Sequence, residues 1–225
     1  MNRVLVLVEG PTERAIIQNV FAPDLGAKNV SINPRVVGLP GHKGGNRYAV
    51  VRRELRNLIC QEPDSTITMF FDYYALGEEW PGKENTKGKN LKTCRDILEN
   101  ALSETVKQDV GKIYNANKFI PYIQFHETES LLFADPEEMA KVFEKMALKP
   151  VFEKIVEECG GCERINSKPE SAPSKRIIEH FSRYKKGSSV NAHAYRIIQH
   201  IGVEKIRKEC PNFNDWYSKL ERLGE

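Results

Sequence analysis

The stretch VLVEGPTE (residues 6–13) joins an apolar run to a Glu, a Gly, a Pro and a second Glu. The run over residues 3–8 is typical of a strand that is covered on both faces of a sheet. Pro11 suits the first turn of a helix, and the apolar side chains that follow it as far as Phe21 recur on one helical face. The sequence therefore predicts a buried strand followed directly by a helix, with Glu9 at the corner between them.

Strand-like and helix-like segments alternate after this opening. Further strands are predicted at 35–39, 66–71 and 119–125, and helices at about 47–59 and 91–106. Asn46 is placed to cap the first of these helices. The order βαβαβαβ predicts an α/β fold in which helices cover both faces of a mainly parallel sheet.

The pattern changes from Asp135 onward, where no convincing strand remains. Short helices are predicted at about 136–146, 150–158, 174–183, 191–200 and 212–222. We therefore predict two parts, an α/β domain over residues 1–134 and a helical subdomain over residues 135–225 that packs on it.

The composition is that of a globular protein outside the membrane. Hydrophobic residues make up 40% of the 225 residues, and no apolar run approaches the roughly 20 residues that a membrane helix requires. The five cysteines, an odd number, favour reduced thiols, and the Cys159–Cys162 pair has no second ligand pair at a recognisable spacing for zinc. The net charge of +3 is too balanced to indicate nucleic-acid binding by itself. We expect a cytoplasmic protein.

Acidic residues follow three of the predicted strands. Glu9 follows the first strand, Asp72 the third and Glu127 the fourth, while Glu13 lies one helical turn beyond Glu9. The carboxyl ends of parallel strands meet at one edge of a sheet, so these side chains are expected to gather there. Gathered carboxylates repel unless a cation neutralises them, and hard oxygen ligands suit Mg²⁺ or Mn²⁺. The pattern predicts all four as metal-binding and catalytic residues; taken singly, each acid can also be a helix cap or a surface charge.

Six blocks of the sequence carry a resemblance to a known family. In order they are VEGPTE (8–13), FFDYYAL (70–76), WPG (80–82), IPYIQFHETESLLFADPE (120–137), INSKPESAPSKRI (165–177) and CPNFNDWYSKL (210–220). Together they resemble small bacterial Toprim-like proteins of uncharacterised function that are often found beside ATPases in presumed phage-defence loci. The Glu-Gly-x-Thr-Glu form is also similar to the Toprim domains of OLD-family (overcoming lysogenization defect) nucleases.

The resemblance implies a Toprim-like Rossmannoid core and metal-dependent phosphodiester chemistry. It implies Glu9 as a general acid/base or metal ligand, and Glu13 and Asp72 as metal ligands. The second Toprim motif is usually Asp-x-Asp, whereas Asp72 is followed here by two tyrosines. Either Glu127 or Glu129 replaces the missing acid, or the site binds metal weakly and has lost catalysis. We assign Tyr74 to packing or to stacking on substrate.

Two segments offer contacts for phosphate. GHKGGNRY (41–48) combines backbone amides with Lys43 and Arg47, although a surface turn is the alternative because the nucleotide-binding GK[ST] ending is absent. APSKRI (172–177) places Lys175 and Arg176 at a predicted helix start, where cations are unfavourable unless an anion binds nearby. We predict these four residues as nucleic-acid contacts, and Lys175 also as a catalytic contact to phosphate.

The leading hypothesis from the sequence is a Mg²⁺- or Mn²⁺-dependent nuclease in a phage-defence or DNA-processing system. Its substrate would be nucleic acid, with DNA favoured over RNA, and its partner an ATPase. The alternative is a non-catalytic Toprim-like module that senses nucleic acid or a nucleotide and regulates an ATPase. A phosphotransferase or small-molecule phosphatase is a weaker third hypothesis, because no nucleotide-binding motif is present.

Overall fold

The computed structural model describes residues 1–39, 42–165, 171–184 and 193–225. The strands are β1 (Asn2–Val8), β2 (Val30–Val36), β3 (Gly38–Leu39), β4 (His42–Lys43), β5 (Thr66–Asp72), β6 (Phe119–Ile120) and β7 (Ile123–Gln124). The α-helices are α1 (Pro11–Ile16), α2 (Ala22–Gly26), α3 (Tyr48–Gln61), α4 (Leu91–Val110), α5 (Pro136–Val142), α6 (Lys149–Cys159), α7 (Pro173–His180), α8 (His193–Ile201), α9 (Val203–Glu209) and α10 (Pro211–Glu221).

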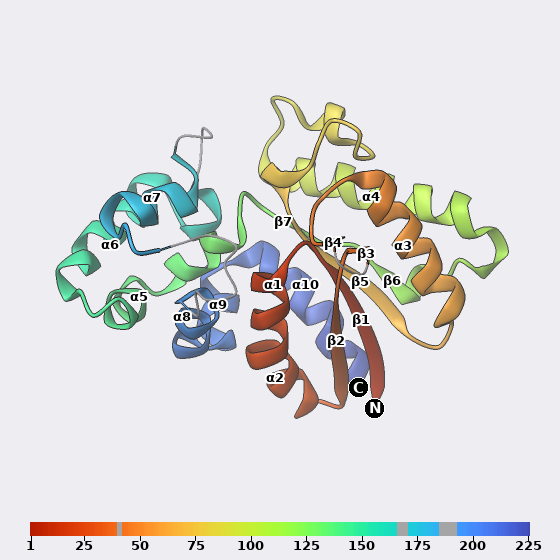
Figure 1. The fold of residues 1–225 in the computed structure, drawn as a ribbon, viewed down its shortest axis with the longest axis horizontal. Coiled ribbons are helices and arrows are strands. Elements are labelled where there is room, and N and C mark those ends of the chain that lie inside the picture. Colours follow the sequence, from red (N-terminus) through yellow and green to blue (C-terminus); the bar gives the residue numbers. More distant parts are fainter. Residues whose placement is uncertain (40–41, 166–170, 185–192) are drawn as a thin grey trace.

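The central sheet is parallel, as the alternation of strands and helices predicts. Its order is β2-β1-β5-β6, and β7 continues beside the end of β5 (Figure 1). Val8, the last residue of β1, lies beside Val36 on one side and Phe70 on the other. All of these strands therefore point their carboxyl ends toward the same edge, which is where the acidic residues follow.

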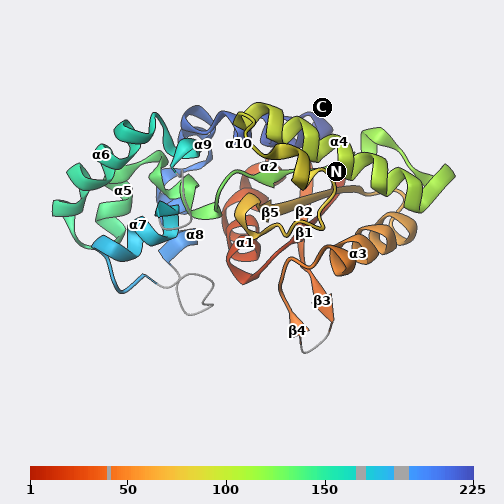
Figure 2. The ribbon, with the colours of Figure 1, turned by 90° about the horizontal axis from the view of Figure 1, so that it is seen from above.

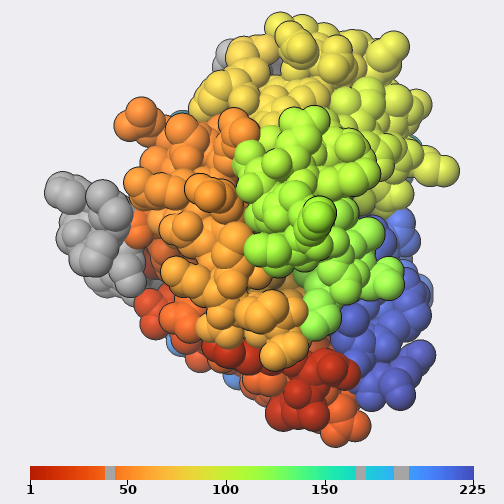
Figure 3. All heavy atoms as spheres, turned by 90° about the vertical axis from the view of Figure 1, so that its right-hand side faces the viewer, coloured from red at the N-terminus to blue at the C-terminus, as the bar shows by residue number. Residues whose placement is uncertain are grey.

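The two faces of the sheet carry separate hydrophobic clusters, because successive side chains of a strand point to opposite faces. Val4, Val6 and Val8 of β1 pack with α1, the π-helical turn η1 (Ile17–Phe21), α2 and α10 on one face. Leu5 and Leu7 pack with α3 and α4 on the other. Figure 3 shows the segments of α3, in orange, and of α4, in yellow-green to green, side by side on the surface of the molecule. A strand buried on both faces explains why the opening run is apolar without a break.

Two predicted strands differ in their limits. The second strand begins at Val30, whereas the prediction began at residue 35. Polar residues and Pro34 interrupt VSINPRV (30–36), so no apolar run marks its start. The edge position of β2 explains both features, because an edge strand tolerates a proline and an exposed face. The fourth strand is divided at Pro121 into β6 and β7.

The cap predicted for the third helix is wrong. The helix begins at Tyr48 with Arg47 in the cap position, and the Arg47 side chain forms no cap hydrogen bond; the Tyr48 N–H donates to Glu79 at 3.5 Å instead. The Asn46 side chain instead donates to the backbone carbonyl of Ala75. That contact fixes the loop before α3 to the segment that follows β5.

The C-terminal half is helical, as predicted, but its last helix returns to the sheet. Helices α5 to α9 form a group beside the sheet (Figures 1 and 2). Helix α10 lies on the sheet face that α1 and α2 also cover. The Trp216 ring of α10 stacks on Tyr122 at 4.7 Å, and its indole nitrogen donates to Thr68 of β5. The boundary at residue 134 stays a prediction, since one hydrophobic cluster includes residues from both sides of it. In the described part of the chain, no helix has the length and apolarity to cross a bilayer.

Candidate functional site

An acidic pocket opens at the carboxyl edge of the sheet. It has a volume of about 190 Å³ and is lined by Glu9, Glu13, Asp72 and Glu129, together with backbone at 10–12 and 44–45. Glu9 follows β1 directly, and Asp72 is the last residue of β5, the neighbouring strand. Of the four acids predicted to gather at this edge, Glu9, Glu13 and Asp72 line the pocket and Glu127 does not. Their role as metal ligands stays a prediction.

Asp72 is held by the segment that follows β7. One of its carboxylate oxygens accepts hydrogen bonds from the backbone N–H of Thr128 at 2.8 Å and from the Thr128 hydroxyl at 2.7 Å. Both groups are buried, so the two bonds fix the orientation of the carboxylate against the pocket. Thr128 was not predicted as a site residue, although it lies between two acids in the HETE segment (126–129).

The two acids of the HETE segment take different positions. One oxygen of Glu127 accepts the backbone N–H of Ser174 at 2.9 Å, which places this carboxylate at the first turn of α7. Glu129 lines the acidic pocket and accepts the Tyr184 hydroxyl at 3.0 Å. Of the two residues that could replace the missing acid, Glu129 is therefore the one that lines the pocket with Asp72.

Tyr184 brings the helical part of the chain to the acidic pocket. Burial raises the pKa of its hydroxyl well above the usual value, and the nearby charges of Glu129, Glu127 and Glu13 raise it further. A neutral phenol that donates to a carboxylate stabilises the ionised acid without adding charge. Sequence reasoning missed Tyr184, because nothing in the local pattern around it indicates a contact with the HETE segment.

The donors of the acidic pocket fit a hard divalent cation in their chemistry. Four carboxylates are oxygen ligands of the kind that Mg²⁺ and Mn²⁺ prefer, and Glu13 also lies in the first turn of α1, where a negative charge is favourable. Among the described residues, no three His, Cys, Asp or Glu side chains form a group that could hold a metal ion as placed. Chelation would therefore require side-chain rotations in the pocket.

A glycine loop forms one wall of the pocket. The backbone N–H of Gly45 donates to the carbonyl of Glu9 at 3.0 Å, and that of Gly44 donates to the carbonyl of Val37 at 2.6 Å. Gly44 has φ +103° and Gly45 has φ +118°, a region that side-chain-bearing residues rarely adopt. The loop therefore ties the ends of β1 and β2 together with a backbone shape that needs glycine.

His126 and Tyr74 stack beside the acidic residues. Their rings are 5.2 Å apart and inclined by 21°, and the Tyr74 backbone N–H donates to the His126 carbonyl. His126 has φ +63° and is buried, while Tyr74 is 41% exposed. Burial lowers the pKa of His126 to about 4 against the opposing effect of Glu127, so the ring is neutral at neutral pH. Tyr74 thus packs on His126, and its stacking on a substrate stays a prediction.

The predicted phosphate contacts lie in two places. Arg47 is exposed at the start of α3, beside the glycine loop, whereas the Lys43 side chain lies outside the described residues. Lys175 is exposed in the first turn of α7, next to the Ser174 N–H that binds Glu127, and Arg176 donates to the carbonyl of Ser171. The basic residues of segments 166–170 and 185–192 lie outside the described residues.

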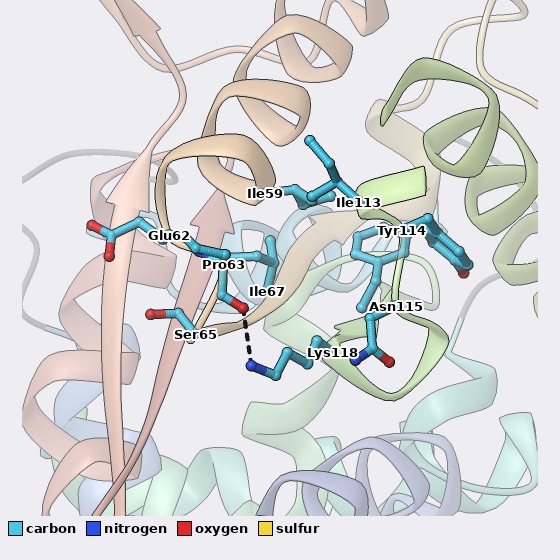
Figure 4. Close-up of a pocket in the computed structure, with 10 residues that line it drawn as sticks. Ile59, Glu62, Pro63, Ser65, Ile67, Ile113, Tyr114, Asn115 and Lys118 are labelled. Atoms are coloured by element: carbon cyan, nitrogen blue, oxygen red, sulfur yellow. Dashed lines mark hydrogen bonds between the residues drawn. The ribbon is translucent and has the colours of Figure 1, made fainter. Parts of the chain in front are cut away.

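Two other pockets lie away from the acidic edge. Figure 4 shows a small one of about 30 Å³ at the amino ends of β5 and β6, where Lys118 donates to the carbonyl of Pro63. It has room for about one water molecule. A larger pocket of about 680 Å³ lies between the start of α4 and α10, and Arg95 and Asp215 on its wall form an ion pair. Neither contains a predicted site residue.

Comparison with known proteins identifies one family. The sequence model of a family described as "Domain of unknown function (DUF4276)" matches residues 8–221. No curated protein and no solved structure matches the chain. The matched range includes the acidic pocket, the HETE segment and α10.

Proposed function

The chain belongs to the DUF4276 family, and from that premise we propose that it is a Mg²⁺- or Mn²⁺-dependent nuclease that hydrolyses phosphodiester bonds in nucleic acid. The observation that carries the proposal is the acidic pocket, where Glu9, Glu13, Asp72 and Glu129 from three separate segments converge. Carboxylates rarely gather in a partly buried pocket without a cationic ligand, because their mutual repulsion destabilises the fold.

The residues of the pocket have separate roles in this proposal. Glu9, Glu13, Asp72 and Glu129 would hold the divalent ion, which would activate water and neutralise charge on the leaving oxygen. Thr128 and Tyr184 orient Asp72 and Glu129 through the hydrogen bonds described above. Glu127 would have a positioning role, because its bond to Ser174 fixes the first turn of α7. That turn carries the exposed Lys175, which we propose as a contact to the substrate phosphate.

The biological setting follows from the Toprim-like motifs and stays a proposal. We place the protein in the cytoplasm, in a phage-defence or DNA-processing system, with DNA favoured over RNA as substrate and an ATPase as partner. Arg47 is exposed beside the glycine loop that forms one wall of the acidic pocket. Lys175 is exposed next to Ser174, which bonds to Glu127. Two exposed cations near the pocket support a polyanionic substrate.

The first experiment is digestion of plasmid, single-stranded DNA and RNA with and without Mg²⁺ or Mn²⁺. We expect metal-dependent cleavage, and a decrease of at least about 100-fold in Glu9→Gln and in Asp72→Asn, since each removes a ligand charge from the pocket. Isothermal titration with Mn²⁺ should show the same two variants losing the ion.

Glu157→Gln and Glu158→Gln serve as charge-matched controls, because these exposed acids of α6 lie outside the acidic pocket. Both should cleave like the unaltered protein. If the folded protein binds Mn²⁺ at the acidic pocket and yet cleaves none of the three substrates, the nuclease proposal is wrong.

A second candidate function has its own observation. The acid expected two residues after Asp72 is a tyrosine, and an oxygen of each HETE acid already accepts a hydrogen bond, from Ser174 or from Tyr184. Such a site favours a non-catalytic module that senses nucleic acid or nucleotide and regulates an ATPase. Co-purification with an ATPase, together with full biological activity in a Glu9→Gln, Asp72→Asn double variant, would favour this function over catalysis.

A further inference from the structure

A second cavity adjoins the acidic pocket and is lined by cations. It has a volume of about 450 Å³ and lies between β3, the glycine loop and α3, where Figure 2 shows the β3–β4 hairpin standing beside the helix. Its polar lining includes Asn46, Arg47 and Arg53, and its apolar lining includes Val37 and Val50. We call it the arginine pocket. Its volume falls within the range of ligand sites in proteins.

Arg47, just before α3, and Arg53 within it are the two cations that line the arginine pocket. Both are exposed, and neither side chain forms a hydrogen bond or ion pair with a residue in the described part of the chain. Arg52, by contrast, forms a bidentate pair with Asp109 of α4. That pair lowers the pKa of Asp109, and the charge of Arg56 lowers it further, which places Arg56 on the α4 side. The two arginines of the pocket therefore have their donors available to an anion.

The two pockets share residues of the glycine loop. Gly44 and Gly45 line both of them, and the Gly45 N–H is bonded to the carbonyl of Glu9. These shared residues have no side chains, so the two pockets adjoin closely at this point. An anion in the arginine pocket would thus lie next to the carboxylates that are proposed to hold the metal ion.

We propose that the arginine pocket binds a phosphate of the substrate strand that neighbours the phosphodiester at the acidic pocket. This inference rests on the proposed nuclease function and specifies its substrate: a polynucleotide with at least two consecutive phosphates, and not a phosphomonoester. An acidic pocket alone repels a polyanion, and guanidinium groups beside it supply attraction through bidentate bonds to phosphate oxygens.

The test is binding of a short fluorescently labelled oligonucleotide in EDTA, measured by anisotropy over a series of salt concentrations. Arg53→Gln and Arg47→Gln should each weaken binding roughly tenfold, the loss expected for one charge-assisted contact. Each should also lower the slope of log Kd against log salt by about one. Arg56→Gln is the matched control, since it removes the same charge from the same helix outside the pocket, and it should change Kd by less than about twofold.

The outcomes separate this inference from the nuclease proposal. Binding without metal needs no cleavage, so the arginine pocket can be supported even if no substrate is cut. If the oligonucleotide is cleaved but Arg53→Gln and Arg47→Gln bind it like the unaltered protein, the arginine pocket is not a phosphate site. An equal loss in Arg56→Gln would also overturn the inference, because it would indicate a general charge effect. Equal affinity for a mononucleotide and for the oligonucleotide would contradict the requirement for two phosphates.

Discussion

Thr128 determines how Asp72 faces the acidic pocket. Its backbone N–H and its hydroxyl both donate to the same oxygen of Asp72, so the hydroxyl can be removed while the amide bond remains. In Thr128→Val we expect Mn²⁺ affinity and cleavage to fall roughly tenfold, because a ligand that loses an orienting bond binds its ion less well. The free energy of unfolding should fall by only about 1–2 kcal/mol, as measured by urea denaturation.

Two variants make this prediction specific. Thr128→Ser keeps a hydroxyl at the same position and should restore Mn²⁺ affinity to near the original value. Thr105→Val removes a hydroxyl that donates to the Ala101 carbonyl within α4, away from the acidic pocket, and it should leave Mn²⁺ affinity unchanged. Equal Mn²⁺ affinity in Thr128→Val and the unaltered protein would show that Asp72 needs no such orientation.

At the scale of the element, α10 begins on a buried acid. The two carboxylate oxygens of Glu163 accept the backbone N–H groups of Asn212 and Phe213 at 2.8 and 2.9 Å, which satisfies donors in the first turn of the helix. Burial raises the pKa of Glu163 from 4.5 to about 6, despite these bonds and the charge of Arg95. The cap is thus sensitive to pH in a defined window.

The native state holds the Glu163 proton to a higher pH than the unfolded state, so unfolding releases a proton between pH 4.5 and about 6. The contribution of this group to the free energy of unfolding should therefore fall by about 2 kcal/mol as the pH rises through that window. Urea denaturation of the unaltered protein and of Glu163→Gln at several pH values measures it as a difference that changes with pH. Glu158→Gln, an exposed acid on α6, should give a difference that is constant. A constant difference for Glu163→Gln as well would mean that its native pKa is ordinary.

At the scale of the whole molecule, the last helix completes the core. Aromatic rings of α10 pack against Phe21 of η1, Phe70 of β5 and Tyr122, on the sheet face opposite α3 and α4. The side chain of Asn2, at the first strand, also donates to the carbonyl of Leu223 just after α10. The α/β part is therefore covered on one face by the end of the chain.

A chain truncated after residue 209 should lose cooperative unfolding, because removal of α10 exposes a sheet face of large apolar side chains. We expect a weak near-UV circular dichroism signal and binding of an apolar dye. The point variant Trp216→Ala should lower the free energy of unfolding by about 3–5 kcal/mol in the full chain. A truncated chain that unfolds cooperatively with an intact near-UV signal would show instead that the core does not need α10.

The sequence by itself determined the features that depend on neighbours along the chain. Unbroken apolar runs predicted β1 and β5, helical spacing predicted α3 and α4, and the acids after those strands predicted that Glu9 and Asp72 meet. These predictions succeed because the direction of a side chain from a strand or helix is set locally, and because parallel strands that pair must end at one edge.

Only the tertiary structure decided the features that depend on contacts distant in sequence. The polar strand β2 is stable because it pairs with β1 at the sheet edge, and no local pattern reveals that partner. Glu129 lines the acidic pocket, whereas Glu127 bonds to the first turn of α7, and this division depends on a helix more than 40 residues further along the chain. Tyr184 bonds to an acid of the acidic pocket, and Arg53 lines the arginine pocket. Spacing along the chain does not predict these contacts, because they depend on how distant elements pack.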